Sequence, residues 1–394
     1  MGNVKNITFF KSFLFEDSLP PIYNTASVDD LFFENKKNSP FSITNSVIKV
    51  NDVPDYFNLE TVNCPQKIVV KKTKTIQGHL VELSTFKTID AYLKSKFGSK
   101  SRSNLRRYKN RLETCFNIKY VSYYGNISKE KYNSLFKVLK SLLVRRFAEK
   151  QETNYELQHF DEYYKTIYNL IANKKASLFV IYDGEKPISI RINMFKNNRG
   201  YYILSGYDID YSKFHLGAID MLKNIEWCIN NGFKVYNLLK GYDYYKTKWA
   251  TKSHYYYNHI AYNSNKTSTL LLGQYLYIKE QLKYKFYNVL KRYNLISKLK
   301  TFKQTIFSIL GGDGTKKITV SISDFYEAEA YKIIEINIEK NNDFAFLRKP
   351  VYDFLFLNNN SLNNLTILKL ADYTNKFVIH SKGKKKLITV NGIT

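Results

Sequence analysis

Residues 178–262 constrain the fold of this 394-residue chain more than any other stretch. Short runs of alternating apolar and polar residues, separated by turn signals such as Asp183-Gly184, give way to a helical spacing and then return to strand character. The expected elements are strands at 178–182, 187–195 and 201–205, a helix at 216–230 ending at Asn231-Gly232, and strands at 235–239 and 255–262. A loop or turn is expected at 241–249, between the last two strands. This order predicts an α+β (α/β) fold built on a mixed central sheet.

Composition and spacing along the whole chain predict four regions. They are an irregular N-terminal region at 1–84, a core at 85–264, a basic helical segment at 265–310, and a small α+β domain at 315–394. Within the core, a very basic helix is expected near 101–113 and an amphipathic helix at 128–149. The C-terminal helical segment and small domain are therefore expected as an appendage to the core.

The chain is strongly basic, with 61 Lys and Arg against 34 Asp and Glu and a formal net charge of +27. Such a balance favours anionic partners, for example nucleic acid, a phosphorylated donor or an acidic membrane surface. The chain is also rich in Lys, Asn, Tyr, Phe and Ile together, the set that AT-rich codons produce. Charge alone therefore does not select a partner.

The three cysteines, Cys64, Cys115 and Cys228, are isolated, and no Cys/His spacing typical of a zinc site occurs. No metal is therefore expected. No window reaches the roughly 18 apolar residues that a membrane-spanning helix needs. We expect a cytoplasmic protein whose basic segment at 267–310 either contacts the inner face of the membrane peripherally or packs on the core.

The order of elements in 178–262 can provide the parts that acyl transfer requires. A thioester carbonyl must be held and polarised, and the proton of the attacking amine must be removed. The strand expected at 201–206 leads into the helix expected at 216–230. The N-terminus of the helix at 216–230 can bind the donor's pyrophosphate, because its N–H groups and dipole favour anions.

Residues 85–262 resemble the GNAT-fold family that includes cellulose- and exopolysaccharide-biosynthesis acetyltransferases and the Fem-type peptidyl transferases. The resemblance rests on SRSNLRRYKNRLE at 101–113, DGEKPISIRINMF, LSGYDIDYSKFHLGAIDML, and GFKVYNLLKGYDYYKTKWA, in that order over about 180 residues. It implies a GNAT fold, acyl-CoA (acetyl-CoA) as co-substrate, and a second, degenerate GNAT half in the N-terminal region.

Two departures from the family pattern occur at the expected site. Where GNAT enzymes carry R/Q-x-x-G-x-G/A, this chain has residues 212–218 with the single glycine Gly217, and Asn237 stands where relatives often carry an acidic residue. Lys213 and His215 could compensate as side-chain contacts to phosphate. The residues expected to bind the donor are Ser205, Gly206, Tyr207, Lys213, His215, Leu216, Gly217 and Ala218.

Three residues are candidates for catalysis and two for binding the acceptor. Asp208 is a candidate general base or a turn cap, Tyr245 a proton donor to the leaving thiolate, and Lys246 an anion-binding or surface lysine. Arg191 is expected either on a solvated sheet face or in a substrate cleft, and Trp249 either there or in the core.

Three functions are compatible with these features of the sequence. The first is N-acyl transfer from acyl-CoA to an amine, with an amino sugar of surface-polysaccharide biosynthesis as the acceptor that the resemblance implies. The second is Fem-type transfer from aminoacyl-tRNA, which the single glycine and the +27 charge favour. The third is a non-catalytic GNAT-derived scaffold that binds a partner or membrane through its C-terminal regions.

Overall fold

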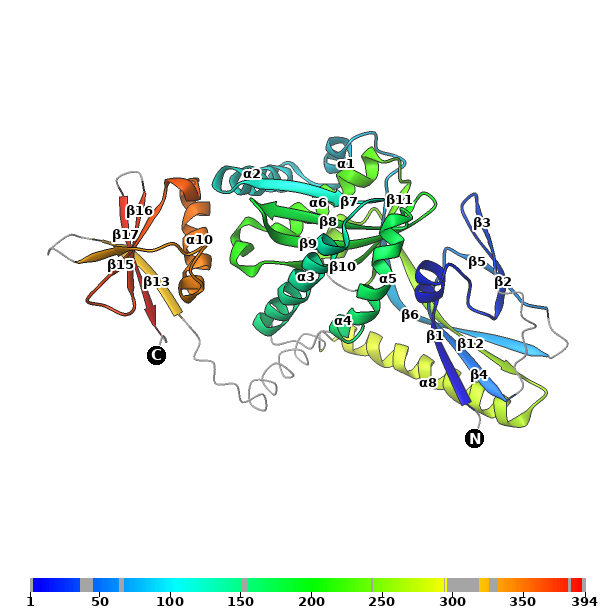
Figure 1. Cartoon of the computed structure of the whole chain (residues 1–394). Coiled ribbons are helices and arrows are strands. Elements are labelled where there is room, and N and C mark those ends of the chain that lie inside the picture. The colour runs from blue at the N-terminus through cyan, green and yellow to red at the C-terminus, as the bar shows by residue number, and fades with distance from the viewer. Residues whose placement is uncertain are drawn as a thin grey trace.

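The computed structural model describes residues 3–35, 45–63, 67–150, 155–241, 244–293, 295, 319–325, 332–381 and 384–391. A nine-stranded mixed sheet forms its centre (Figure 1). The strand order is β1 (Asn3–Thr8), β4 (Ser46–Pro54), β12 (Lys252–Asn263), β6 (Ile68–Glu82), β11 (Val235–Lys240), β10 (Arg199–Tyr207), β9 (Lys186–Lys196), β8 (Ala176–Asp183) and β7 (Ile118–Tyr123). Only the pairs β1–β4 and β10–β11 are parallel, so the mixed α/β architecture expected from the sequence is confirmed.

Helices cover both faces of this sheet because residues in β8 and β9 alternate between two cores. Leu178 and Val180 of β8 and Ile190 and Ile192 of β9 pack with α3 (Lys129–Lys150) and α5 (Phe160–Ala172), whereas Phe179 and Ile181 of β8 pack on the face of α6 (Leu216–Asn230). The short helices α1 (Ile89–Lys96) and α7 (Tyr244–Trp249) and the basic helix α2 (Ser99–Cys115) lie with α6. A loop was expected where α7 forms.

The sheet continues across the boundary expected at residue 84. Strand β6, from the N-terminal region, lies between β11 and β12, and it pairs with β12 from Leu80 opposite Lys252 to Ile68 opposite Asn263. The same region adds a short π-helix η1 (Lys11–Phe15) and a small sheet of β2 (Tyr23–Val28), β3 (Leu31–Glu34) and β5 (Asn58–Thr61). The N-terminal strands and the core are thus one hydrogen-bonded layer.

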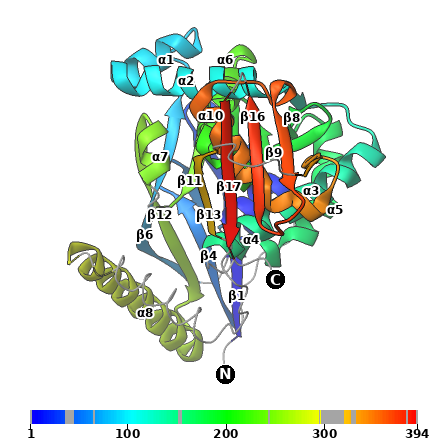
Figure 2. The same ribbon diagram turned by 90° about the vertical axis from the view of Figure 1, so that its left-hand side faces the viewer.

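A five-stranded sheet forms the C-terminal domain (Figure 2). Its strands are β13 (Thr319–Asp324), β14 (Ile333–Glu335), β15 (Thr366–Leu370), β16 (Lys376–Ser381) and β17 (Lys384–Asn391), with α10 (Arg348–Asn358) against them. Helix α10 also packs on the core, where the ring of Tyr352 lies 4.6 Å from that of Tyr211 and the ring of Phe356 lies 5.1 Å from that of Phe214. The apolar side of α10 is therefore shared between the two domains.

The predicted basic segment at 265–310 is described as helix α8 (Thr267–Arg292), followed by Tyr293 and Leu295. Residues 296–310 lie outside the described part of the chain. Within the described residues, no helix combines the length and apolar character needed to cross a membrane.

Gly78 in β6 is required by packing rather than by backbone conformation. A β-carbon at this position would lie 2.4 Å from both His254 Nε2 and Tyr256 Cε2, which are buried rings of β12. Gly78→Ala is therefore expected to lower the free energy of unfolding by about 2–3 kcal/mol, as overpacking does, in urea unfolding followed by circular dichroism. Gly98→Ala is the control, since a β-carbon there meets nothing within 4 Å. Equal stability of both variants would contradict this account.

Candidate active site

Strands β10 and β11 separate in the middle of the sheet. They pair only from Arg199 opposite Val235 to Tyr201 opposite Asn237, although both strands continue beyond this point. Each strand carries a bulge where the two part, between Tyr202 and Leu204 in β10 and between Asn237 and Leu239 in β11. Because bulges bend a strand and end its pairing, they open one edge of β10 toward a gap.

Asn237 holds the bulge of β11. Its Oδ1 accepts a hydrogen bond from the Leu239 amide at 2.7 Å, and Leu239 has a left-handed backbone with φ of 60°. Its Nδ2 donates to the Tyr56 hydroxyl at 2.7 Å. This amide, which stands where relatives often carry an acid, therefore contributes to the shape of the gap.

The N-terminus of α6 lies at the open end of this gap. The chain leaves β10 through a 3₁₀ turn, η2 (Ile209–Phe214), and His215 then adopts a left-handed conformation immediately before the helix. A β-carbon on Gly217 would lie 3.4 Å from the ring of Tyr207, and the Tyr245 hydroxyl donates to the Gly217 carbonyl at 2.5 Å. The end of β10, the start of α6 and helix α7 therefore meet at Gly217.

Three positively charged side chains lie close enough to His215, the residue before α6, to act on its pKa. Burial lowers the pKa of His215, and the positive charges of Lys248, Arg107 and Lys213 lower it further. The imidazole of His215 stacks on Tyr108 of α2 with 4.0 Å between ring centroids. Among the described residues, no carboxylate forms an ion pair with Arg107, Lys213 or Lys248. We call these three residues and His215 the basic cluster; it can hold an anion at the helix N-terminus.

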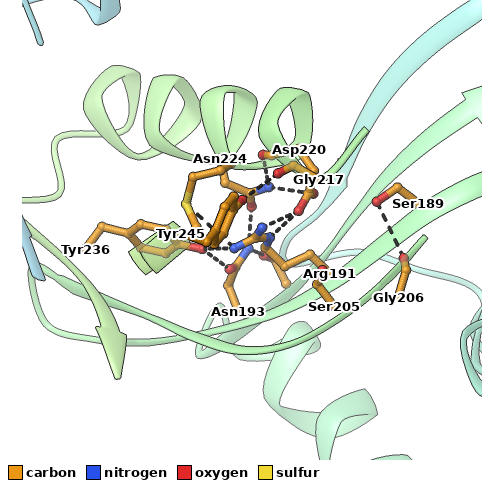
Figure 3. A network of polar contacts seen from close by, with 12 residues as sticks. Ser189, Arg191, Asn193, Ser205, Gly206, Gly217, Asp220, Asn224, Tyr236 and Tyr245 are labelled. Atoms are coloured by element: carbon orange, nitrogen blue, oxygen red, sulfur yellow. Dashed lines mark hydrogen bonds and ion pairs between the residues drawn. The ribbon is translucent and has the colours of Figure 1, made fainter. Parts of the chain in front are cut away.

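A buried polar network lies between α6 and the sheet (Figure 3). Arg191 of β9 donates from Nε to Asp220 Oδ2 at 2.7 Å, and its Nη2 contacts the same oxygen. Arg191 Nη1 also donates to the Tyr236 hydroxyl at 3.2 Å, which in turn donates to Asn193 Oδ1 at 2.7 Å. Asn224 donates to Asp220 Oδ1 at 3.1 Å and accepts from Asn193 Nδ2 at 2.8 Å.

Burial determines the behaviour of the charged pair in this network. It raises the pKa of Asp220, and the nearby Arg191 guanidinium only partly opposes this shift. Burial by itself lowers the pKa of Arg191, but the Asp220 carboxylate and the nearby Tyr236, Tyr202 and Tyr245 together more than offset this effect, and the net pKa is raised. The Arg191 side chain is 1% exposed, and each of its three nitrogens contacts either Asp220 or Tyr236. The ion pair between Arg191 of β9 and Asp220 of α6 therefore links the sheet to this helix beneath the gap. Asp220 was not identified from the sequence as the partner of Arg191.

The candidate catalytic residues lie in different surroundings. Burial raises the pKa of Tyr245 well above its usual range, so its hydroxyl keeps its proton at neutral pH. Lys246 donates from Nζ to the Lys240 carbonyl at 2.7 Å, which fixes the end of β11. Asp208 caps η2 by accepting from the Asp210 amide, and its carboxylate pairs with Arg145 at 2.9 Å and Lys186 at 3.3 Å.

The remaining candidates divide between the gap and the core. Gly206 packs on α3, where a β-carbon would lie 3.0 Å from Leu139 Cδ1. The Ser205 carbonyl accepts a hydrogen bond from Arg146 at 3.4 Å. The side chains of Leu216 and Trp249 are about 1% exposed within two core clusters, and Ala218 packs beside the second. Leu216 and Ala218 can therefore contact a donor only through their backbone, and Trp249 supports α7.

The gap faces a cavity of about 710 Å³ on the sheet face opposite α6. Its lining includes Ile203 of the β10 bulge and Leu239 and Lys240 of β11, together with residues of η1, β4 and α5. Two ion pairs lie in its wall, Lys240 with Asp52 at 2.6 Å and Lys11 with Glu162 at 2.6 Å. This volume suits a small-molecule or sugar acceptor. Its residues come from distant segments without a shared motif, so sequence reasoning missed them.

No group of three His, Cys, Asp or Glu side chains suited to a metal ion is present in the residues that the structure describes.

A family model described as an acetyltransferase (GNAT) domain matches residues 99–247, which extend from α2 into α7 and include the gap and the start of α6. This part of the chain is thus similar to a GNAT acetyltransferase domain, and its mixed central sheet is consistent with a GNAT fold. No curated protein matches the sequence.

Several solved structures are similar to part of this chain at low identity. L-PGS from Bacillus licheniformis is 15% identical, with 61% of this chain and 72% of that chain covered and a TM-score of 0.37. A FemX structure is 10% identical, with 58% and 75% covered and a TM-score of 0.40. A conserved protein of unknown function from Bacteroides thetaiotaomicron is 11% identical, with 55% and 69% covered and a TM-score of 0.37. These likenesses concern the fold and carry no information about substrates.

Proposed function

We propose that the GNAT domain of this protein transfers an acyl group from acyl-CoA to an amine. The observation that carries the proposal is the gap between β10 and β11 beside the N-terminus of α6 and the basic cluster. The open edge of β10 offers backbone groups to an extended amide-containing arm, and the helix terminus with its cations offers a site for pyrophosphate. Apart from Lys248 of the basic cluster, both features lie within residues 99–247, which match the GNAT model.

The reaction needs two substrates on opposite sides of the gap. The amine nitrogen, entering from the cavity lined by Ile203 and Lys240, attacks the thioester carbonyl; a C–N bond forms and the C–S bond breaks. The amine loses one proton and the leaving thiolate gains one. Tyr245 is the proposed proton donor, since its hydroxyl is protonated and reaches Gly217 at the start of α6. We assign Asp208 and Lys246 positioning roles, because their contacts fix η2 and the end of β11.

The acceptor is proposed as an amino sugar of surface-polysaccharide biosynthesis, which rests on the resemblance of residues 85–262 to that branch of the GNAT family. The cavity supports this class because its volume and its mixed carboxylate and lysine wall suit a polar, amine-bearing ring.

Calorimetric titration with acetyl-CoA and desulfo-CoA at low and physiological salt tests the donor. We expect saturable binding, and Arg107→Ala/Lys248→Ala should weaken it at least about tenfold, because phosphate loses charged partners. The matched control is Arg106→Ala/Lys252→Ala, which removes two exposed charges outside the basic cluster. Gly217→Glu should also abolish binding by placing a carboxylate at the helix terminus, whereas the isosteric Gly217→Gln should retain more of it.

Equal affinity of acetyl-CoA for the basic-cluster variant and its control would show that the donor does not bind here. Bulk tRNA is titrated in parallel, because the +27 charge and the exposed Arg106 and Arg107 of α2 favour a second candidate, transfer from aminoacyl-tRNA. Salt-sensitive tRNA binding without acetyl-CoA binding would select that candidate. If neither acetyl-CoA nor tRNA binds, the result would favour a non-catalytic scaffold.

A further inference from the structure

Helix α8 carries apolar side chains on two sides: Leu270, Leu272, Leu276 and Tyr277 pack partly buried against the sheet, and a second set faces away from it. Its side toward the sheet carries Thr269, Gly273 and Glu280, the three buried residues of the helix. Its opposite side carries seven large apolar side chains that are 49–66% exposed: Leu271, Tyr275, Ile278, Leu282, Phe286 and Val289, with Tyr293 just after the helix. We call these seven residues the apolar stripe. A surface helix normally turns such a stripe toward the core.

The contacts of the inner side fix this orientation. Gly273 lies so close to β12 that a β-carbon would be 2.3 Å from the Tyr262 ring. Glu280 pairs with Lys49 of β4 at 2.6 Å and accepts from Asn258 of β12 at 2.8 Å. Rotating the helix to bury its apolar stripe would remove the close packing at Gly273 and leave Lys49 without this carboxylate. The apolar stripe therefore faces outward because of specific contacts.

The spacing of the apolar stripe indicates one straight surface. Its members follow one another at intervals of three or four residues, which at about 100° per residue places them on a single face of the helix. Exposed contiguous apolar surface of this kind marks an interaction site. In Figure 1, α8 runs along the outside of the sheet beneath β4 and β12.

The charges of the helix indicate what covers this face. Lys279, Lys283, Lys285, Lys291 and Arg292 are exposed, whereas the sole acidic residue of α8, Glu280, is buried in its ion pair. A second copy of this chain would place like charges against like charges. An anionic bilayer instead offers acyl chains to the apolar stripe and phosphate groups to the lysines.

We propose that α8 is a membrane-docking helix that lies in the interface of an anionic bilayer. The apolar stripe enters the boundary between headgroups and acyl chains, and the flanking lysines bind lipid phosphates. Tyr275 and Tyr293 suit this depth, because their rings are apolar and their hydroxyls are polar. This inference does not depend on the proposed acyl transfer.

Co-sedimentation of the full chain with vesicles tests the proposal. The vesicles contain either phosphatidylcholine alone or phosphatidylcholine with phosphatidylglycerol. We expect binding to the anionic vesicles that weakens as salt rises, and at least about tenfold weaker binding by Leu282→Asp/Phe286→Asp. The matched control is Leu357→Asp/Phe32→Asp, in which two side chains of the same types, 62% and 61% exposed, receive the same charges elsewhere. This control should bind as the unmodified protein does.

Several results would overturn the proposal. Equal loss of binding in both double variants would show that charge alone is responsible, and absence of binding to anionic vesicles would exclude this surface as their site. A dimer in light scattering that Leu282→Asp/Phe286→Asp dissociates, without vesicle binding, would identify a second copy as the occupant. Circular dichroism and acetyl-CoA titration of the variants establish that they are folded, and they separate this proposal from that of the donor site.

Discussion

Replacing Asp220 by alanine is expected to lower the free energy of unfolding by about 3–5 kcal/mol, because a buried charge then loses its counter-ion. Arg191 is 1% exposed, and Asp220 is the carboxylate that its guanidinium contacts. Asp220 also accepts from Asn224, so the variant leaves a second buried donor without this partner. Urea unfolding followed by circular dichroism measures the change.

Two further variants make this prediction specific. Asp90→Ala removes an exposed carboxylate that lies 3.6 Å from Arg106, and it should cost less than about 1 kcal/mol. Arg191→Met/Asp220→Leu replaces the buried pair by apolar side chains and should recover much of the stability that Asp220→Ala loses. If Asp220→Ala were as stable as Asp90→Ala, Arg191 would have to be compensated by groups other than this carboxylate.

Acidification from about pH 6.5 to pH 5 is expected to destabilise the protein by about 2 kcal/mol for each of two buried histidines, or about 4 kcal/mol together. Burial lowers the pKa of His254 and that of His259 to about 3 in the folded protein. In the unfolded chain both titrate near 6.5, so between these values the unfolded state binds more protons. Stability is therefore complete above about pH 6.5 and is lost as the pH falls toward 3.

The surroundings of the two rings explain why they remain neutral. The Nδ1 atom of His259 and the Tyr23 hydroxyl share a hydrogen bond of 2.5 Å, and the positive charge of Lys72 lowers the pKa of His259 further. His254 packs between the rings of Tyr56 and Tyr256. Urea unfolding at pH 7 and pH 5 should show that His254→Asn and His259→Asn each reduce the acid-induced loss by about 2 kcal/mol. An unchanged loss in both variants would assign the acid sensitivity to other groups.

Local patterns sufficed to predict most elements of the core. The helix expected at 216–230 is α6, and Gly232 has the left-handed backbone, with φ of 72°, that its place after the helix indicated. The basic helix forms as well, but it begins at Ser99 after Gly98. Helix α7 replaces an expected loop, since the burial of Trp249 against Tyr92 and Phe97 stabilises a short helix that its own sequence specifies weakly.

Individual site residues were less predictable than the elements that carry them. The strand-to-helix order placed Gly217 at the start of the helix, because that order depends on residues near one another in the chain. Tyr245, in contrast, is 28 residues from Gly217, and only packing of α7 brings its hydroxyl to the Gly217 carbonyl. Arg191 was assigned to a solvated face or a cleft, yet it lies in a buried ion pair. Alternation within β9 fixes which face of the sheet Arg191 occupies, but Asp220 is 29 residues away and only packing of α6 brings it near.

The sequence by itself determined the succession of strands and helices, the basic character and the position of Gly217 in the first turn of α6, since these depend on residues near one another in the chain. Only the tertiary structure decided that β6 joins β11 to β12, that the basic cluster gathers around His215, and that α8 turns its apolar stripe outward. Each of these depends on contacts between distant segments, whose free energies no local spacing encodes.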